Sequence, residues 1–235
     1  ICLQLGPQPV PARRAELMQI HSHPSPNCGP RRDGLVPELV VIHYTAMHSA
    51  DAALERLCDP QYEVSAHYLI AEDGTVTQLV PEHLRAWHAG AGHWAGRDDV
   101  NSRSIGIELD NDGQRPFPET QMRSLMTLLR GILDRWSIPA QGVIGHSDMA
   151  PDRKFDPGPH FDWPRLEAAG LAAPRGTGAG PTDPTPETFR AAARAAGYTA
   201  DVTDDALLHA VRLRYRPKAT GPLTAEDYAP LHLAR

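Results

Sequence analysis

Polar side chains that could do chemistry together follow two predicted buried strands and line the polar face of a third. His43 follows the apolar run LVVI at 39–42, His146 follows VIG at 143–145, and Glu108 lies in SIGIEL at 104–109. Rigid backbone at a strand end can hold such a side chain in a cleft. Two imidazoles and one carboxylate form a zinc-binding set that leaves a fourth position open for water. Zinc lowers the pKa of that water to about 7, and a nearby carboxylate can then accept its proton.

The loop after His146 supplies further carboxylates and a cation. Its sequence, SDMAPDRKFDPG at 147–158, contains Asp148, Asp152, Lys154 and Asp156. Lys154 and Asp156 are two residues apart, so in extended backbone both side chains point to the same side. Spacing alone leaves the choice of carboxylate ligand open, because the two histidines are far apart in the chain and form no local zinc motif.

The elements that must position these residues alternate between strands and helices. Apolar patterns predict strands at 39–42, 66–70, 75–80, 104–110 and 142–145, the second and third joined in a hairpin at Asp73-Gly74. Helical spacing predicts a short helix at 49–57 and a long amphipathic helix from Pro118 to Trp136. The fold class is therefore α/β up to about residue 171.

Composition divides the chain into four parts. Residues 1–34 are expected to form an extended lead-in, of which 1–17 could be foreign to the functional protein because Met18 heads a more ordinary opening. Residues 35–171 form the α/β domain, and the Pro- and Gly-rich segment 172–185 is a linker. Residues 186–235 form a small all-α appendage with helix caps at Thr185, Thr203 and Thr224.

Charge and composition exclude several classes of protein. The 235 residues include 23 Lys and Arg against 29 Asp and Glu, a net charge of −6, which argues against a nucleic-acid-binding protein. No run approaches the roughly 18 apolar residues of a membrane-spanning helix. Three cysteines without CxxC spacing support neither a disulfide framework nor a thiolate metal site. A start at Met18 would lack an export signal and favours the cytoplasm; a leader removed before Ile1 would mean the periplasm or outer membrane.

Six collinear segments resemble the type-2 N-acetylmuramoyl-L-alanine amidase family, which is related to peptidoglycan-recognition proteins and phage lysozyme-like amidases. They are VIHYTA (41–46), SAHYLI (65–70), DGTVTQLV (73–80), AWHAG (86–90), NSRSIGIEL (101–109) and GHSDMAPDRKFDPG (145–158). The resemblance covers about 35–168 and implies a mixed central sheet flanked by helices. It also implies zinc-dependent hydrolysis of the amide between muramic acid, or its 1,6-anhydro form, and L-alanine.

The same resemblance assigns roles to individual residues. It makes His43, His146 and Asp156 the zinc ligands, because the family places the carboxylate ten residues after the second histidine. It makes Glu108 the general base and Lys154 the group that stabilises the oxyanion. The residues expected to contact substrate are Trp87, His88, Asn101, Arg103 and Arg153. His67 is expected to be structural.

Two other functions stay open at this point. A module of the same fold could bind peptidoglycan without cleaving it, although the complete set of ligands, Glu108 and Lys154 favours an enzyme. A zinc peptidase acting within the stem peptide has the same ligand set. The C-terminal helices resemble a shortened peptidoglycan-binding domain, and a plain packing role is the alternative. If they bind glycan, the expected partner is polymeric murein; if they only pack, it is small peptidoglycan fragments. The oligomeric state is left open.

Overall fold

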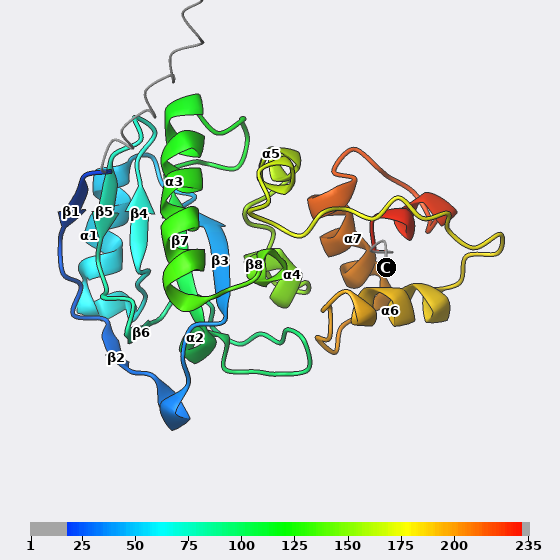
Figure 1. The fold of residues 1–235 in the computed structure, drawn as a ribbon, viewed down its shortest axis with the longest axis horizontal. Helices are drawn as coiled ribbons and strands as arrows, with labels where there is room; N and C mark the ends of the chain where they lie inside the picture. The colour runs from blue at the N-terminus through cyan, green and yellow to red at the C-terminus, as the bar shows by residue number, and fades with distance from the viewer. Residues whose placement is uncertain (1–17, 232–235) are drawn as a thin grey trace, which may run out of the picture.

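A computed structural model describes residues 18–231 of the protein, so the prediction about residues 1–17 lies outside the described part. Its centre is a six-stranded sheet in the order β1 (Ile20–Ser22), β5 (Val76–Gln78), β4 (Tyr68–Ile70), β7 (Ser104–Leu109), β3 (Leu39–Tyr44) and β8 (Val143–Gly145) (Figure 1). The β4–β5 pair is antiparallel, and every other neighbouring pair is parallel. The mixed sheet expected from the sequence is thereby confirmed. A separate antiparallel ribbon joins β2 (Cys28–Pro30) to β6 (Leu84–Ala86).

One face of the sheet is covered by the long helix α3 (Glu119–Trp136), which crosses in front of β7 in Figure 1. Its apolar stripe buries Met122, Leu125 and Leu129 against Ile105 and Ile107 of β7. The short helix α5 (Trp163–Ala168) extends this core through Trp163 and Leu166. The predicted helix after Pro118 is confirmed, since apolar residues at a spacing of three and four fall on one side of a helix.

Two groups of helices cover different parts of the opposite face. Helix α1 (Ala50–Cys58), capped by Ser49 Oγ, packs Ala53 and Leu57 against Leu69 of β4. Farther along, α6 (Pro186–Ala195) and α7 (Asp204–Tyr215) share a core with the strands β3 and β8. The residues of the expected helical appendage thus pack directly on the sheet.

The contacts of the C-terminal helices are extensive. Phe189 of α6 and Val211 of α7 lie in one buried cluster with Val41 of β3, Ile144 of β8 and Met149. Thr185 and Thr203 cap the two helices as predicted. The third predicted helix is only a 3-10 turn, Ala225–Asp227, followed by a second such turn, Ala229–Leu231. Residues 173–185 contain neither helix nor strand.

The lead-in expected to be extended contains two short strands that the sequence patterns did not predict. Residues 20–22 form the edge strand β1, and residues 28–30 form β2. Both are three residues long and are held by backbone hydrogen bonds, which leave no hydrophobic period in the sequence. The remaining short elements are the 3-10 turns Arg32–Gly34, Pro60–Tyr62 and Ala140–Gly142 and the helices α2 (Val100–Arg103) and α4 (His146–Met149).

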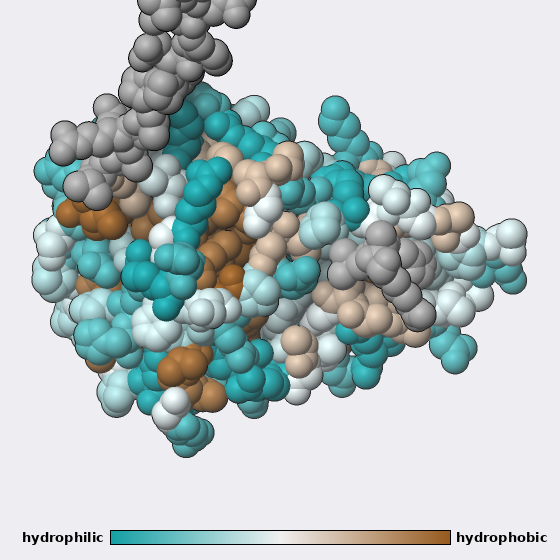
Figure 2. All heavy atoms as spheres, viewed as in Figure 1, coloured by the Kyte–Doolittle hydropathy of each residue, from teal (hydrophilic) through white to brown (hydrophobic). Residues whose placement is uncertain are grey.

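The outer surface is predominantly polar on the face shown in Figure 2, where hydrophobic residues appear in separate groups between hydrophilic ones. No helix within residues 18–231 has both the length and the apolar character needed to cross a bilayer.

Candidate active site

Strand register brings His43 and Glu108 together. They are direct partners on the neighbouring parallel strands β3 and β7, which lie about 4.8 Å apart. Side chains alternate along each strand, so His43 lies on the same face as Val41, and Glu108 on the same face as Ser104 and Gly106. This is the face that α1 and the C-terminal helices cover.

His146 lies beside His43 at the end of β8, the other strand that pairs with β3. It is the first residue of α4 and follows directly on β8. The turn is held by Asp148, whose Oδ2 accepts the backbone N–H of Gly145 at 2.7 Å. Asp148 also accepts hydrogen bonds from Tyr198 Oη at 2.7 Å and Arg214 Nη1 at 2.6 Å. These bonds tie the turn that carries His146 to the C-terminal helices.

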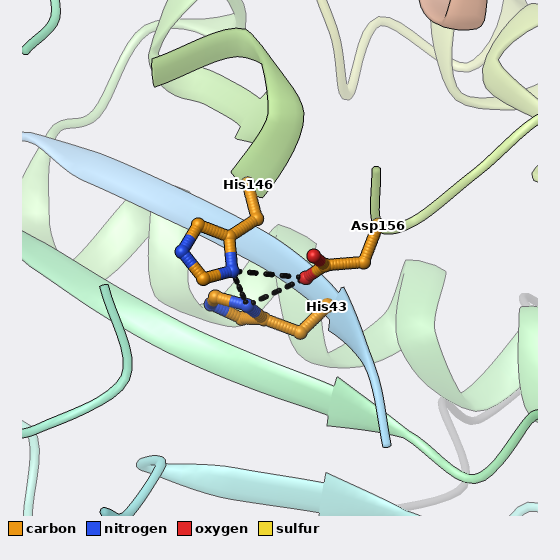
Figure 3. Close-up of side chains that lie close together, drawn as sticks. All are labelled: His43, His146 and Asp156. Carbon is orange, nitrogen blue, oxygen red and sulfur yellow. Dashed lines mark hydrogen bonds and ion pairs between the residues drawn. The ribbon is translucent and has the colours of Figure 1, made fainter. Parts of the chain in front are cut away.

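Asp156 completes a cluster of three possible metal ligands. Figure 3 shows His43 on β3, His146 at the start of α4 and Asp156 on the following loop, with their polar atoms converging. The two Nδ1 atoms are 2.9 Å apart, and Asp156 Oδ2 lies 2.9 Å from His43 Nδ1 and 3.0 Å from His146 Nδ1. All three residues are buried. Asp148 and Asp152 are outside this group, because Asp148 is bonded as described above and Asp152 is exposed.

The donor set fits a divalent cation. Zinc binds nitrogen and oxygen ligands at about 2.0–2.2 Å in a tetrahedral arrangement, which places the ligand atoms about 3.3–3.6 Å from one another. This is a few tenths of an ångström more than the 2.9–3.0 Å between these three atoms. Burial and the neighbouring His146 lower the pKa of His43 to about 4. Burial raises the pKa of Asp156, but hydrogen bonds with His146 and His43 outweigh it and hold that pKa below its ordinary value. A neutral His43 and an ionised Asp156 are the forms that bind metals.

Glu108 is placed to exchange protons beside this cluster. Burial and the charge of Asp156 raise its pKa to about 8, and the charge of Lys154 opposes them. Its Oε2 is inaccessible to solvent and has no hydrogen-bond partner among residues 18–231. A bound cation would favour the ionised carboxylate, as cations do for nearby acids.

The cluster lies in an open cleft of about 330 Å³. Trp87, His88, Arg153 and Lys154, all predicted site residues, line it together with Glu108 and the three possible ligands. Trp87 is half-buried. Arg153 Nη2 donates to the carbonyl of Ala89 at 2.6 Å, so its guanidinium holds part of the cleft wall.

Sequence patterns did not single out several other residues of the cleft. Arg56 and Leu57 come from α1, which supplies one wall, and Met47 and the half-exposed Phe155 also line the cleft. The sequence held one signal for Phe155, because this aromatic residue stands between the predicted site residues Lys154 and Asp156.

Two residues expected to contact substrate have other partners. The described residues that line the cleft do not include Asn101 or Arg103. Asn101 Oδ1 accepts the backbone N–H groups of His88 at 3.0 Å and Ala89 at 2.8 Å. Arg103 is 3% exposed; it pairs with Glu38 and donates to the carbonyl of Arg97 at 3.0 Å. Their polar side chains stabilise loops behind the cleft.

His67 has a complete set of hydrogen bonds away from the cluster. Its Nδ1 accepts the backbone N–H of Gly106 at 3.0 Å, so Nε2 carries the hydrogen and donates to the carbonyl of Leu84 at 3.1 Å. Burial lowers its pKa to about 3. These bonds agree with the structural role expected for His67.

Comparisons with known proteins point to one family. Residues 33–159 match the family model described as N-acetylmuramoyl-L-alanine amidase. The chain is 38% identical over 160 residues to the 1,6-anhydro-N-acetylmuramyl-L-alanine amidase AmpD of Escherichia coli (strain K12), an alignment that covers 61% of this chain and 87% of that protein.

Two solved structures extend the similarity beyond that region. One is the N-acetylmuramyl-L-alanine amidase AmiD from E. coli with the substrate anhydro-N-acetylmuramic acid-L-Ala-D-gamma-Glu-L-Lys. It has a TM-score of 0.75 and 33% identity and covers 85% of this chain and 89% of that one. The other is AmpDh3 from Pseudomonas aeruginosa with anhydromuramic pentapeptide, with a TM-score of 0.70, 32% identity, and coverage of 83% and 89%.

Proposed function

Because this chain belongs to the N-acetylmuramoyl-L-alanine amidase family, we propose that it hydrolyses the amide between N-acetylmuramic acid, free or 1,6-anhydro, and L-alanine of the stem peptide. The observation that carries the proposal is the convergence of His43, His146 and Asp156 in a cleft beside Glu108. Relatives of similar structure are described with anhydromuramic peptides as ligands, which supports this substrate class.

We propose zinc as the ion that His43, His146 and Asp156 would hold. Two imidazoles and a carboxylate suit zinc and leave a coordination position open. Zinc bound there would polarise a carbonyl and lower the pKa of a water molecule.

The protein's own groups would move the proton and stabilise charge. Glu108 would accept a proton from the attacking water and deliver it to the nitrogen of the departing L-alanine, as a general base and then acid. Lys154, which lines the same cleft, would place a cation beside the oxygen on which negative charge develops. Trp87, His88 and Arg153 line the groove available to the muramic acid and the peptide.

The test is product analysis with two substrates. Metal-loaded protein would be incubated separately with an anhydromuropeptide and with intact murein sacculi, beside EDTA-treated protein and the Glu108→Ala variant. Mass spectrometry should detect a stem peptide beginning with L-alanine, and both controls should abolish it. A cut within the stem peptide would instead make the protein a peptidase.

The result also distinguishes an enzyme from a binding module. Binding of either substrate without any cleavage would overturn the proposed activity. A preference for the anhydromuropeptide would indicate recycling of small fragments, whereas a preference for sacculi would indicate wall remodelling. The cytoplasmic location stays a prediction from the sequence, and fractionation of the native cells would check it against the periplasm and outer membrane.

A further inference from the structure

Behind His43 runs a chain of hydrogen bonds that has only one possible direction. Ser104 Oγ lies 2.6 Å from the carbonyl oxygen of Val100, which can only accept, so the hydroxyl hydrogen is committed there. His88 Nε2, 3.1 Å from Ser104 Oγ, must therefore donate. A neutral imidazole has one N–H, so His88 Nδ1 is an acceptor, and it lies 3.0 Å from His43 Nε2. His43 thus carries its hydrogen on Nε2.

The metal cluster independently requires the same assignment. His43 directs Nδ1 toward His146 and Asp156. A neutral histidine that binds a metal through Nδ1 carries its hydrogen on Nε2. Ser104 at one end of the hydrogen-bond chain and the metal cluster at the other therefore specify the same tautomer of His43.

The adjacent residue serves the second imidazole. His146 Nε2 lies 3.0 Å from the carbonyl oxygen of Ala89, to which it can donate. His88 and Ala89 thus receive the outer N–H groups of both imidazoles. Asn101 fixes this pair of residues by accepting both of their backbone N–H groups.

The strand beneath makes room for the His88 ring. A Cβ atom on Gly106 would lie 2.3 Å from Cγ of His88. Ser104, Gly106 and Glu108 alternate on one face of β7. Ser104 ends the chain of hydrogen bonds, Gly106 leaves space for the His88 ring, and Glu108 is the acid of the cleft.

We propose that His88 and Ser104 are positioning residues that fix the tautomer and ring orientation of His43, so that Nδ1 faces the metal. The inference rests on the proposed metal site. Groups that hold the outer nitrogen of a ligating histidine typically change metal affinity by about 10–100-fold when mutated. In this protein that group is a second imidazole, itself held by a serine.

The first test observes the tautomers directly in the unmutated protein. Zinc-loaded protein labelled with ¹⁵N-histidine would be studied by long-range ¹H–¹⁵N NMR, with signals assigned from single variants. We expect His43 and His88 both to carry hydrogen on Nε2. A His88 ring with its hydrogen on Nδ1 would overturn the proposal, whatever the variants do.

The second test measures zinc affinity by competition with a chromophoric chelator. His88→Ala should bind zinc about 10–100-fold more weakly, and His88→Gln should recover part of the loss because an amide offers both a donor and an acceptor. His67→Ala is the matched control, since it removes a neighbouring buried imidazole whose hydrogen bonds go to Gly106 and Leu84. It should lose stability but keep its zinc affinity.

Different results would refute the metal site and the positioning role of His88. Absence of zinc binding by the unmutated protein would refute the metal site itself. Tight zinc binding by the unmutated protein and equally tight binding by His88→Ala would refute only the positioning role. A fall of the same size in His67→Ala would also refute it, because general damage to the core would then explain the effect.

Discussion

Replacement of Arg214 by methionine should lower the free energy of unfolding by about 3–5 kcal/mol, the usual result of removing one partner of a buried ion pair. The side chains of Arg214 and Asp148 are 3% and 1% exposed. Methionine fills much of the same volume but donates no hydrogen bond. Asp148 would keep its bonds from Tyr198 and Gly145, yet its buried charge would lose the opposing cation.

Two further variants provide smaller losses of unfolding free energy for comparison. Tyr198→Phe removes only the 2.7 Å hydrogen bond to Asp148, and a hydrogen bond to a charged group contributes about 1.5–3 kcal/mol. Arg123→Met breaks an exposed pair with Glu119, in which the side chains are 65% and 63% exposed. Such pairs contribute about 0–1 kcal/mol, so this variant controls for the loss of an arginine.

Urea unfolding followed by circular dichroism would supply the free energies at one fixed zinc concentration, because bound metal adds to stability. The expected order of loss is Arg214→Met, then Tyr198→Phe, then Arg123→Met. If Arg214→Met lost no more than Arg123→Met, the C-terminal helices would not stabilise the turn of His146 through this pair. A double variant, Asp148→Asn with Arg214→Met, should lose less than the sum of the single changes, since the two residues interact directly.

Three further predictions concern the cleft and its surroundings. Lys154→Met should lower kcat by about 100–1,000-fold with zinc content retained, and a parallel loss of zinc would refute the assigned role. Gly106→Ala should weaken zinc binding because its Cβ would meet the His88 ring. Gly131→Ala, whose Cβ meets only the flexible end of Arg135, should bind zinc normally. Equal zinc affinities of these two variants would contradict crowding of the His88 ring. The pKa of His67 is about 3 in the folded protein and about 6.5 in an unfolded chain, so only the unfolded state takes up its proton between these values. Stability should therefore fall as the pH drops below 6.5, by about 2 kcal/mol at pH 5; His67→Gln should lack that part of the loss in urea unfolding, and an unchanged pH dependence would refute it.

The elements with strong patterns could be predicted from the sequence. The apolar run before His43, the alternation in SIGIEL and the stripe of α3 each follow from one period and one buried face. That alternation also placed Glu108 opposite to Ile107. The ten-residue interval from His146 to Asp156 came from the family resemblance, and the structure brings these two residues together with His43.

What escaped prediction depends on contacts between distant parts of the chain. β1 and β2 are held by backbone bonds that leave no side-chain signal. Asn101 was expected at the substrate, but its amide accepts two backbone N–H groups behind the cleft. Nothing local to Arg214 indicates that it pairs with Asp148, because that pairing exists only after α7 has packed on the sheet.

The pairing of Arg214 with Asp148 also sets the order in which the protein can be completed during biosynthesis. A ribosome releases the chain from its amino end, so His146 and Asp148 emerge well before α7. Until α7 arrives, Asp148 lacks its cation, and the core that surrounds Val41 and Ile144 lacks its cover. The turn that carries His146 can therefore reach its final form only after α7 has left the ribosome and packed on β3 and β8.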